Sequence, residues 1–259
     1  MAKPHVDWTV LPHGKLKRLE HNLLSVSGTM NMPPMGAVTR RMTIVRLADR
    51  RLIIYSAISL DEKEMEALLS YGTPAYLIVP GDIHRMDAKP WKDRFPAMKV
   101  IAPAGAREKI EDVVPVDATE VDFGDPSVRY MTMPGTANKE AVLVVETASG
   151  TTIVLNDLIF DLANRPGFSG WLFKALGMTG DKPHIVLPVK LRQVELRPVR
   201  PVPSLPCASS GRSCSAFICS TPSSSTWPTS SSLDWSSPLP GCCARPRSPS
   251  HDHHCLHCQ

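Results

Sequence analysis

The apolar positions in the first part of the chain follow a strand-like pattern. Residues 40–58 hold two β-rich runs on either side of a polar turn near Asp49, which predicts a hairpin, and residues 19–26 form a shorter run of the same kind. Residues 75–79 (AYLIV) are apolar without a break, as is typical of a strand covered on both faces. Residues 98–103 (MKVIAP) predict a second short buried strand.

Helix-like spacing follows the hairpin. Asp61 is placed to cap a helix, with Glu64 three positions later to reach back to it, and Gly72 ends the apolar stripe that follows. A second short helix is predicted at residues 105–113. Strand, loop, strand and helix in this order predict a layered α/β arrangement.

Three further segments complete the pattern. Residues 127–135 alternate like a strand, and residues 140–160 predict a hairpin that turns at Gly150. Residues 167–178 (GFSGWLFKALGM) form a short, mostly apolar helix, for which packing over a sheet edge is a commoner explanation than contact with a membrane.

The composition sets few limits on function. The chain has 259 residues, 42% of them hydrophobic, which is enough for one sizeable core. A net charge of +4 without any block of like charge does not indicate binding to nucleic acid or to an anionic membrane. No secretory signal or membrane span is evident, so we expect a cytoplasmic protein that acts on a small molecule. Nothing in the sequence indicates an oligomeric state.

The composition changes near residue 197. All seven cysteines lie beyond residue 206 and no lysine follows Lys190. Ser, Pro, Cys and Arg dominate residues 197–259 without a period of 2 or 3.6. The sequence therefore predicts a single domain at residues 1–196, followed by a disordered low-complexity tail.

Three origins for this tail are open: a natural extension, a metal-binding appendage, or an out-of-frame translation of a GC-rich gene. Out-of-frame translation explains most of the composition of this tail, because GC-rich codons read in a shifted frame tend to give Ser, Pro, Arg, Ala and Cys. The final residues, HDHHCLHCQ, contain possible zinc ligands, but their spacing matches no zinc finger. A lost C-terminal helix and strand would leave an exposed sheet edge, and we expect marginal stability or aggregation from it.

Polar residues gather where three of the predicted strands end. In layered α/β folds, ligands bind at the carboxyl ends of strands. Carboxylates and imidazoles suit zinc, iron or manganese, and a metal with an open position generates hydroxide for hydrolysis. The candidates are Asp82, His84 and Asp87 after the first strand, Thr136 and Asn138 after the second, and Asn156 and Asp157 after the third.

A purely structural interpretation stands beside the metal site. Asp82 can bond the backbone of a turn, Asp87 can cap the segment that leads to Trp91, and His84 can be a surface histidine. Asp157 ends an apolar strand, where a carboxylate is costly to bury without a cation or hydrogen-bond donors. Its partners are either a metal ion or the neighbouring amide and backbone N–H groups.

The order of these elements resembles the metallo-β-lactamase superfamily, in particular a divergent bacterial branch of it. The resemblance covers about residues 15–190, and its most specific pieces are IVPGDIHRMDAKPWKDRFP and VLNDLIF. It implies a four-layer αββα sandwich, whose C-terminal part is incomplete in this chain. It also implies hydrolysis of esters, thioesters, lactams or phosphodiesters with one or two metal ions.

The first metal motif of that family, H-x-H-x-D-H, corresponds to residues 82–87. His84 keeps its histidine, and Asp82 and Asp87 stand where the family has histidines. Met86 replaces the aspartate that binds the second metal, and Thr136 replaces the next histidine.

Asp157 matches the bridging aspartate of the family. The resemblance therefore implies at most one zinc, iron or manganese ion, held by Asp82, His84, Asp87 and Asp157. Asp87 or Asp157 would take the proton while a metal-bound water attacks an ester- or lactone-like carbonyl. The alternative is a non-catalytic binding or structural descendant without a metal, and Thr136 favours it.

Overall fold

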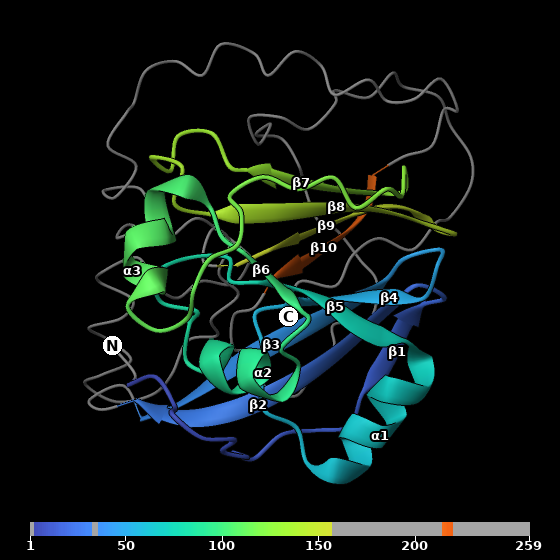
Figure 1. The fold of residues 1–259 in the computed structure, drawn as a ribbon. Coiled ribbons are helices and arrows are strands. Elements are labelled where there is room, and N and C mark those ends of the chain that lie inside the picture. Colours follow the sequence, from blue (N-terminus) through green and yellow to red (C-terminus); the bar gives the residue numbers. More distant parts are fainter. Residues whose placement is uncertain (1–2, 33–35, 157–213, 220–259) are drawn as a thin grey trace, which may run out of the picture.

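Two β-sheets, packed face to face, form the centre of the molecule (Figure 1). The structure is a computed structural model that describes residues 3–32, 36–156 and 214–219. Within these residues, one sheet has the strand order β1-β2-β3-β4-β5-β6 and the other has the order β10-β9-β8-β7.

The first sheet begins as an antiparallel meander and ends as a parallel sheet. Strands β1 to β4 pair antiparallel, whereas β4, β5 and β6 run parallel. Helical crossovers make the parallel pairing possible, with α1 before β5 and α2 before β6. The bounds are β1 (Lys17–Glu20), β2 (Leu23–Met32), β3 (Gly36–Arg46), β4 (Arg51–Tyr55), α1 (Glu62–Tyr71), β5 (Thr73–Ile78), α2 (Ala88–Arg94) and β6 (Lys99–Ile101).

Helix α1 begins at the predicted residue, and one of its two predicted capping bonds is replaced. The Asp61 side chain accepts a hydrogen bond from the Glu64 N–H at 2.9 Å, as predicted. The predicted return bond is replaced, because the Glu64 carboxylate accepts from the Leu16 N–H at 2.7 Å. The Asp61 N–H instead donates to His13 Nε2 at 2.9 Å. His13 and Leu16, in the segment before β1, therefore supply the contacts that the Asp61 N–H and the Glu64 carboxylate were expected to make with each other.

Gly72 ends α1, as the sequence predicts, for a steric reason. Its φ of 174° is extended backbone that any residue can adopt. A Cβ at this position would lie 2.3 Å from the Arg50 carbonyl oxygen and 2.7 Å from a Leu52 methyl carbon. The absence of a side chain therefore lets the end of α1 approach the β3–β4 turn.

The first sheet is buried on both faces, as its apolar runs predict. Figure 1 shows α1 and α2 on one side of this sheet and the second sheet on the other. Helix α3 (Arg107–Glu111), preceded by the 3-10 turn η1 (Ala104–Ala106), contributes to the same helix-facing core. That core includes Val26, Ile44, Leu52, Ile54, Met65, Leu68, Leu77, Trp91 and Ile110. The core between the sheets includes Val45, Ile53, Tyr55, Ile78, Phe123, Leu143, Val145 and Val154.

The second sheet contains the predicted C-terminal hairpin. It consists of β7 (Val128–Thr132), β8 (Ala141–Thr147), β9 (Gly150–Leu155) and β10 (Cys214–Cys219). Strand β10 pairs parallel with β9 and lies within residues 197–259, where the sequence predicts a disordered tail. The described part of this tail is these six residues, CSAFIC, in which Ala216, Phe217 and Ile218 form an apolar run amid Ser- and Pro-rich sequence.

Within the described residues, three layers of the predicted four-layer αββα sandwich are present: the helices, the first sheet and the second sheet. The predicted helix at residues 167–178, the rest of the tail and its His/Cys end lie outside the described residues. Within the described part, no helix is both long and apolar enough to cross a membrane.

Candidate functional site

The loops that follow β4, β5 and β9 meet at one edge of the sandwich. The two sheets are joined there by the Ala141 N–H, which donates to the Pro80 carbonyl oxygen at 2.8 Å. The Tyr55 hydroxyl also donates to the Ala141 carbonyl oxygen at 2.7 Å. These bonds hold the start of β8 against the loop that begins at Pro80. Two of the three predicted polar strand ends meet here, because His84 after β5 contacts Asn156 after β9. The loop after β4 was not among the predictions.

His84 is the centre of the polar contacts at this edge. Its Nδ1 lies 3.2 Å from Ser56 Oγ and 3.1 Å from Asn156 Nδ2. An amide nitrogen can only donate, so Nδ1 accepts and the proton of the neutral ring lies on Nε2. In this tautomer, the Ser56 hydroxyl and the Asn156 amide share the single lone pair of Nδ1. His84 is partly exposed, whereas Ser56 is 6% exposed and Asn156 is 2% exposed.

Ser56 has an unusual backbone conformation. Its φ is +57°, in the left-handed region that costs a non-glycine residue free energy. In β4, Leu52 and Ile54 face the helices while Ile53 and Tyr55 face the second sheet. The positive φ ends this alternation at Ser56, whose side chain bonds to His84. The Ser56 N–H donates to the Ile78 carbonyl oxygen at 3.1 Å, which holds the turn against β5.

Asp87 serves as the acceptor of a buried polar cluster. Its side chain is fully buried, and one carboxylate oxygen accepts from Ser59 Oγ at 3.0 Å and lies 2.9 Å from His5 Nδ1. The other oxygen is paired with the Arg40 guanidinium. Asp87 is the N-cap residue of α2, but its side chain makes no capping bond. The capping alternative is therefore wrong for this side chain, and its assignment as a metal ligand stays a prediction.

Two of the predicted metal donors, Asp87 and His84, have other partners among the described residues, and a third, Asp157, lies outside them. Both oxygens of Asp87 already have donors, and the Arg40 guanidinium beside it would repel a cation. His84 directs its Nδ1 to Ser56 and Asn156, and the neutral tautomer leaves a proton on Nε2. No group of three His, Cys, Asp or Glu side chains suited to a metal occurs in the part of the chain that the structure describes.

The remaining predicted residues are placed as follows. Asp82 lies in the same loop and is partly exposed. Thr136 is buried and donates to the Met133 carbonyl oxygen at 2.7 Å, a bond within its own turn. Asn138 has a φ of 57°, and its carbonyl oxygen accepts from the Gly105 N–H at 2.7 Å. Asp157 lies outside the described residues.

Sequence reasoning missed three residues at this edge. Ser56 carries no motif around it, and only its position directly after an apolar strand could have drawn attention. Arg40 is 47 positions from Asp87, so no local pattern connects them. Glu140 lies against the loop, because a Cβ on Gly81 would be 2.9 Å from its Oε2. An acidic residue at the start of a buried strand was the available signal for Glu140.

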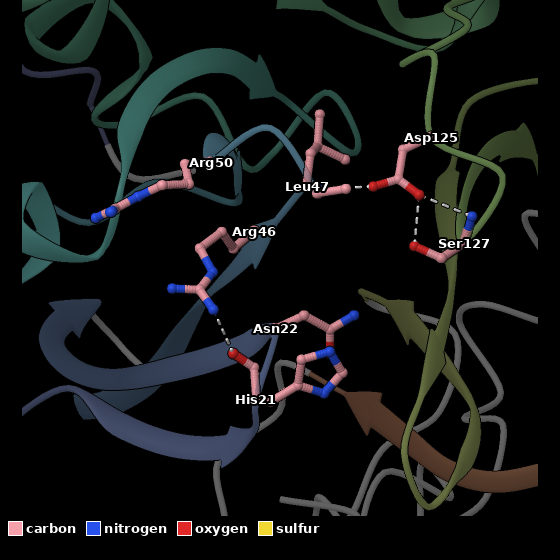
Figure 2. Close-up of a pocket in the computed structure, with 8 residues that line it drawn as sticks. His21, Asn22, Arg46, Leu47, Arg50, Asp125 and Ser127 are labelled. Carbon is pink, nitrogen blue, oxygen red and sulfur yellow. Dashed lines mark hydrogen bonds between the residues drawn. The ribbon is translucent and has the colours of Figure 1, made fainter.

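A pocket of about 420 Å³ lies at the opposite end of β4 (Figure 2). Its polar groups make structural contacts across the two sheets. Asp125 accepts from the Ala48 N–H at 2.8 Å and from the Ser127 hydroxyl at 2.7 Å, and Arg46 donates to the His21 carbonyl oxygen at 3.3 Å. Burial opposes ionisation of Asp125, but the Ser127 hydroxyl and the backbone N–H donors outweigh it and lower the pKa of this carboxyl.

Comparisons with known proteins give likenesses of fold at low identity. No protein-family model matches the chain, and no curated protein matches it significantly. A metallo-β-lactamase from Hirschia baltica is 12% identical, with 60% of this chain and 74% of that chain covered and a TM-score of 0.44.

Two further solved structures give similar values. The mono-zinc form of the metallo-β-lactamase FIM-1 from Pseudomonas aeruginosa is 11% identical, with 58% of this chain and 71% of that one covered and a TM-score of 0.44. The metallo-β-lactamase DIM-1 is 10% identical, with coverages of 71% and 96% and a TM-score of 0.47. At these values, neither a residue role nor an activity is transferred to this chain.

Proposed function

We propose that the protein hydrolyses a small carboxylic ester or lactone at the edge where β4, β5 and β9 end. The observation that carries the proposal is the contact of His84 Nδ1 with Ser56 Oγ at 3.2 Å and with Asn156 Nδ2 at 3.1 Å. A histidine whose basic nitrogen points at a hydroxyl donor can take up a proton during attack on a carbonyl. His84 is therefore assigned as the general base of the site.

The surroundings of His84 support this role. Asn156 donates to Nδ1 and so selects the tautomer in which that nitrogen is basic. The loop is held at Pro80 by β8 and at Asp87 by its buried cluster, so both ends are fixed. A fixed base lowers the cost of reaching a reactive geometry. His84 is partly exposed, which leaves it open to a substrate.

Hydrolysis of p-nitrophenyl acetate and of γ-butyrolactone by the full chain tests the proposal. Replacing His84 by Ala is expected to lower kcat/KM by about 10²-fold or more, the usual contribution of a general base. His21→Ala is the matched control, because His21 lies at the opposite end of the sandwich and is exposed. Equal activity in the two variants would contradict the assignment of His84.

The single-metal form of the site stays a prediction with a separate test. It assigns one zinc, iron or manganese ion to Asp82, His84, Asp87 and Asp157. Plasma mass spectrometry of the purified chain measures bound metal directly. About one equivalent in the parent, lost in Asp157→Ala, would support a metal-dependent hydrolase and count against a proton on His84 Nε2.

The non-catalytic alternative has two structural observations in its favour. Asp87, at a position matching a family ligand, is neutralised by Arg40, and Thr136 bonds within its own turn. A chain that unfolds cooperatively but neither hydrolyses esters or lactones nor retains metal would favour a binding protein that has kept the sandwich without its chemistry.

A further inference from the structure

We infer that Ser56 is a covalent nucleophile, so that the site works through an acyl-enzyme on Ser56 with His84 as its base. This inference rests on the proposed function and goes beyond it, because general-base hydrolysis alone needs only a water molecule as nucleophile. It assigns the substrate class as carboxylic esters.

The first argument is the hydrogen bond itself. A serine hydroxyl is a weak nucleophile unless a base removes its proton during attack. Ser56 Oγ lies 3.2 Å from His84 Nδ1, at the long end of the range expected for such a pair before substrate binds. In the tautomer with its proton on Nε2, Nδ1 carries the lone pair, and the Ser56 hydroxyl lies within reach to donate its proton to it.

The second argument is the backbone at Ser56. A φ of +57° is strained for serine and is kept only where the surrounding contacts enforce it. The Ser56 N–H bond to Ile78 and the Tyr55 hydroxyl bond to Ala141 hold the two sides of this turn. Glycine would adopt the same conformation without strain, so the hydroxyl is retained at a cost in stability. A strained serine between a strand and a loop is a recurrent way to present a nucleophile.

The reaction balances with groups present in the site and one water molecule. Ser56 Oγ attacks the ester carbonyl carbon while its proton moves to His84 Nδ1. The bond from the carbonyl carbon to the alcohol oxygen then breaks, and the leaving alkoxide takes the proton from His84. In the second half, His84 takes a proton from water, the hydroxide oxygen attacks the acyl carbon, and Ser56 leaves and regains its proton. The products are one carboxylic acid and one alcohol.

Labelling of the full chain with a fluorophosphonate tests Ser56 separately from turnover. This probe phosphonylates activated serines with loss of fluoride, and peptide mass spectrometry locates the added group. The reaction is run in the presence of a chelator, so that a metal-bound water plays no part. We expect the label on Ser56, a rate at least about 10²-fold lower in His84→Ala, and no label at this position in Ser56→Gly.

Two variants keep the test independent of folding. Ser56→Gly suits the positive φ and is expected to fold at least as well as the parent, as urea unfolding would show. Ser70→Ala is the matched control, since Ser70 is an exposed serine on α1 whose hydroxyl bonds only the Ala67 carbonyl oxygen. Its labelling should equal that of the parent.

The outcomes separate the two proposals. Label on Ser56 with no ester turnover supports the nucleophile and contradicts the proposed hydrolysis. Ester turnover that depends on His84 but persists in Ser56→Gly overturns the nucleophile and leaves hydrolysis by an activated water. Label on another residue, or an unlabelled parent that is folded, also overturns the inference.

Discussion

The buried pair of Asp87 and Arg40 allows a sharp test of whether this loop is built for stability or for a metal. Replacing Asp87 by Ala removes the only partner that the described residues offer to the Arg40 guanidinium, whose side chain is 11% exposed. Arg40 Nε and Nη2 have no hydrogen-bond partner among the described residues, so the variant leaves the whole cation buried and unpaired. The loss expected on breaking such a pair is about 3–5 kcal/mol of unfolding free energy.

Urea unfolding followed by tryptophan fluorescence measures this loss, since the fully buried Trp91 lies four residues away on α2. Asp93→Ala is the matched control: Asp93 pairs with Lys89 at 2.5 Å on the exposed side of the same helix. Its removal is expected to cost about 0.3–0.5 kcal/mol.

The double variant Asp87→Leu with Arg40→Met tests whether the loss in Asp87→Ala comes from the unpaired charge. Removing both members leaves no buried charge unpaired, although the Ser59 hydroxyl and the His5 ring lose their contact with Asp87. Replacing a buried ion pair by apolar residues is often neutral or stabilising by about 1–4 kcal/mol. The double variant should therefore be clearly more stable than Asp87→Ala. A loss below about 1 kcal/mol in Asp87→Ala, or a double variant as unstable as the single, would refute a structural role for this carboxylate.

Two further predictions concern the rest of the sandwich. Gly72→Ala should lower the free energy of unfolding in urea by about 1–3 kcal/mol, because the new Cβ would clash with the Arg50 carbonyl oxygen. Gly14→Ala is the control and should be almost neutral, because the nearest atom to its Cβ would lie at 3.7 Å. The pKa of Asp125 is lowered from its ordinary value of 3.8 in the folded protein. The stability that its ionised form contributes should therefore be complete above pH 3.8 and decline as pH falls through the lower folded-state pKa. Asp125→Asn should remove this part of the pH dependence between about pH 2 and 5, and an unchanged profile would contradict the assignment.

The sequence predicts the elements well where their signals are local. The hairpin, the helix after Asp61 and the buried strand at residues 75–79 each depend on residues within one short window, and each is found. The cap of α1 differs because Glu64 bonds to Leu16, 48 positions away. Only tertiary packing brings such groups together, and no periodicity encodes it.

The candidate site was likewise predictable where the signal is local and not where it depends on tertiary contacts. The positions of His84 and Asn156 at strand ends were predictable, because strand ends can be read from apolar runs. The role of Asp87 was not, because its partner Arg40 comes from a different strand. The positive φ of Ser56 could not be predicted either, because serine seldom adopts this backbone conformation.

The contact of His5 with Asp87 makes the loop around His84 sensitive to the beginning of the chain. The His5 ring touches the Asp87 carboxylate, and the His5 N–H donates to the Met86 carbonyl oxygen at 2.8 Å. Trp8 adds a second attachment through its bond to the Leu60 carbonyl oxygen and its ring contact with Trp91. An affinity tag or a proteolytic cut that pulls these residues away would therefore change the loop itself. Preparations that differ only in their first ten residues should differ in activity.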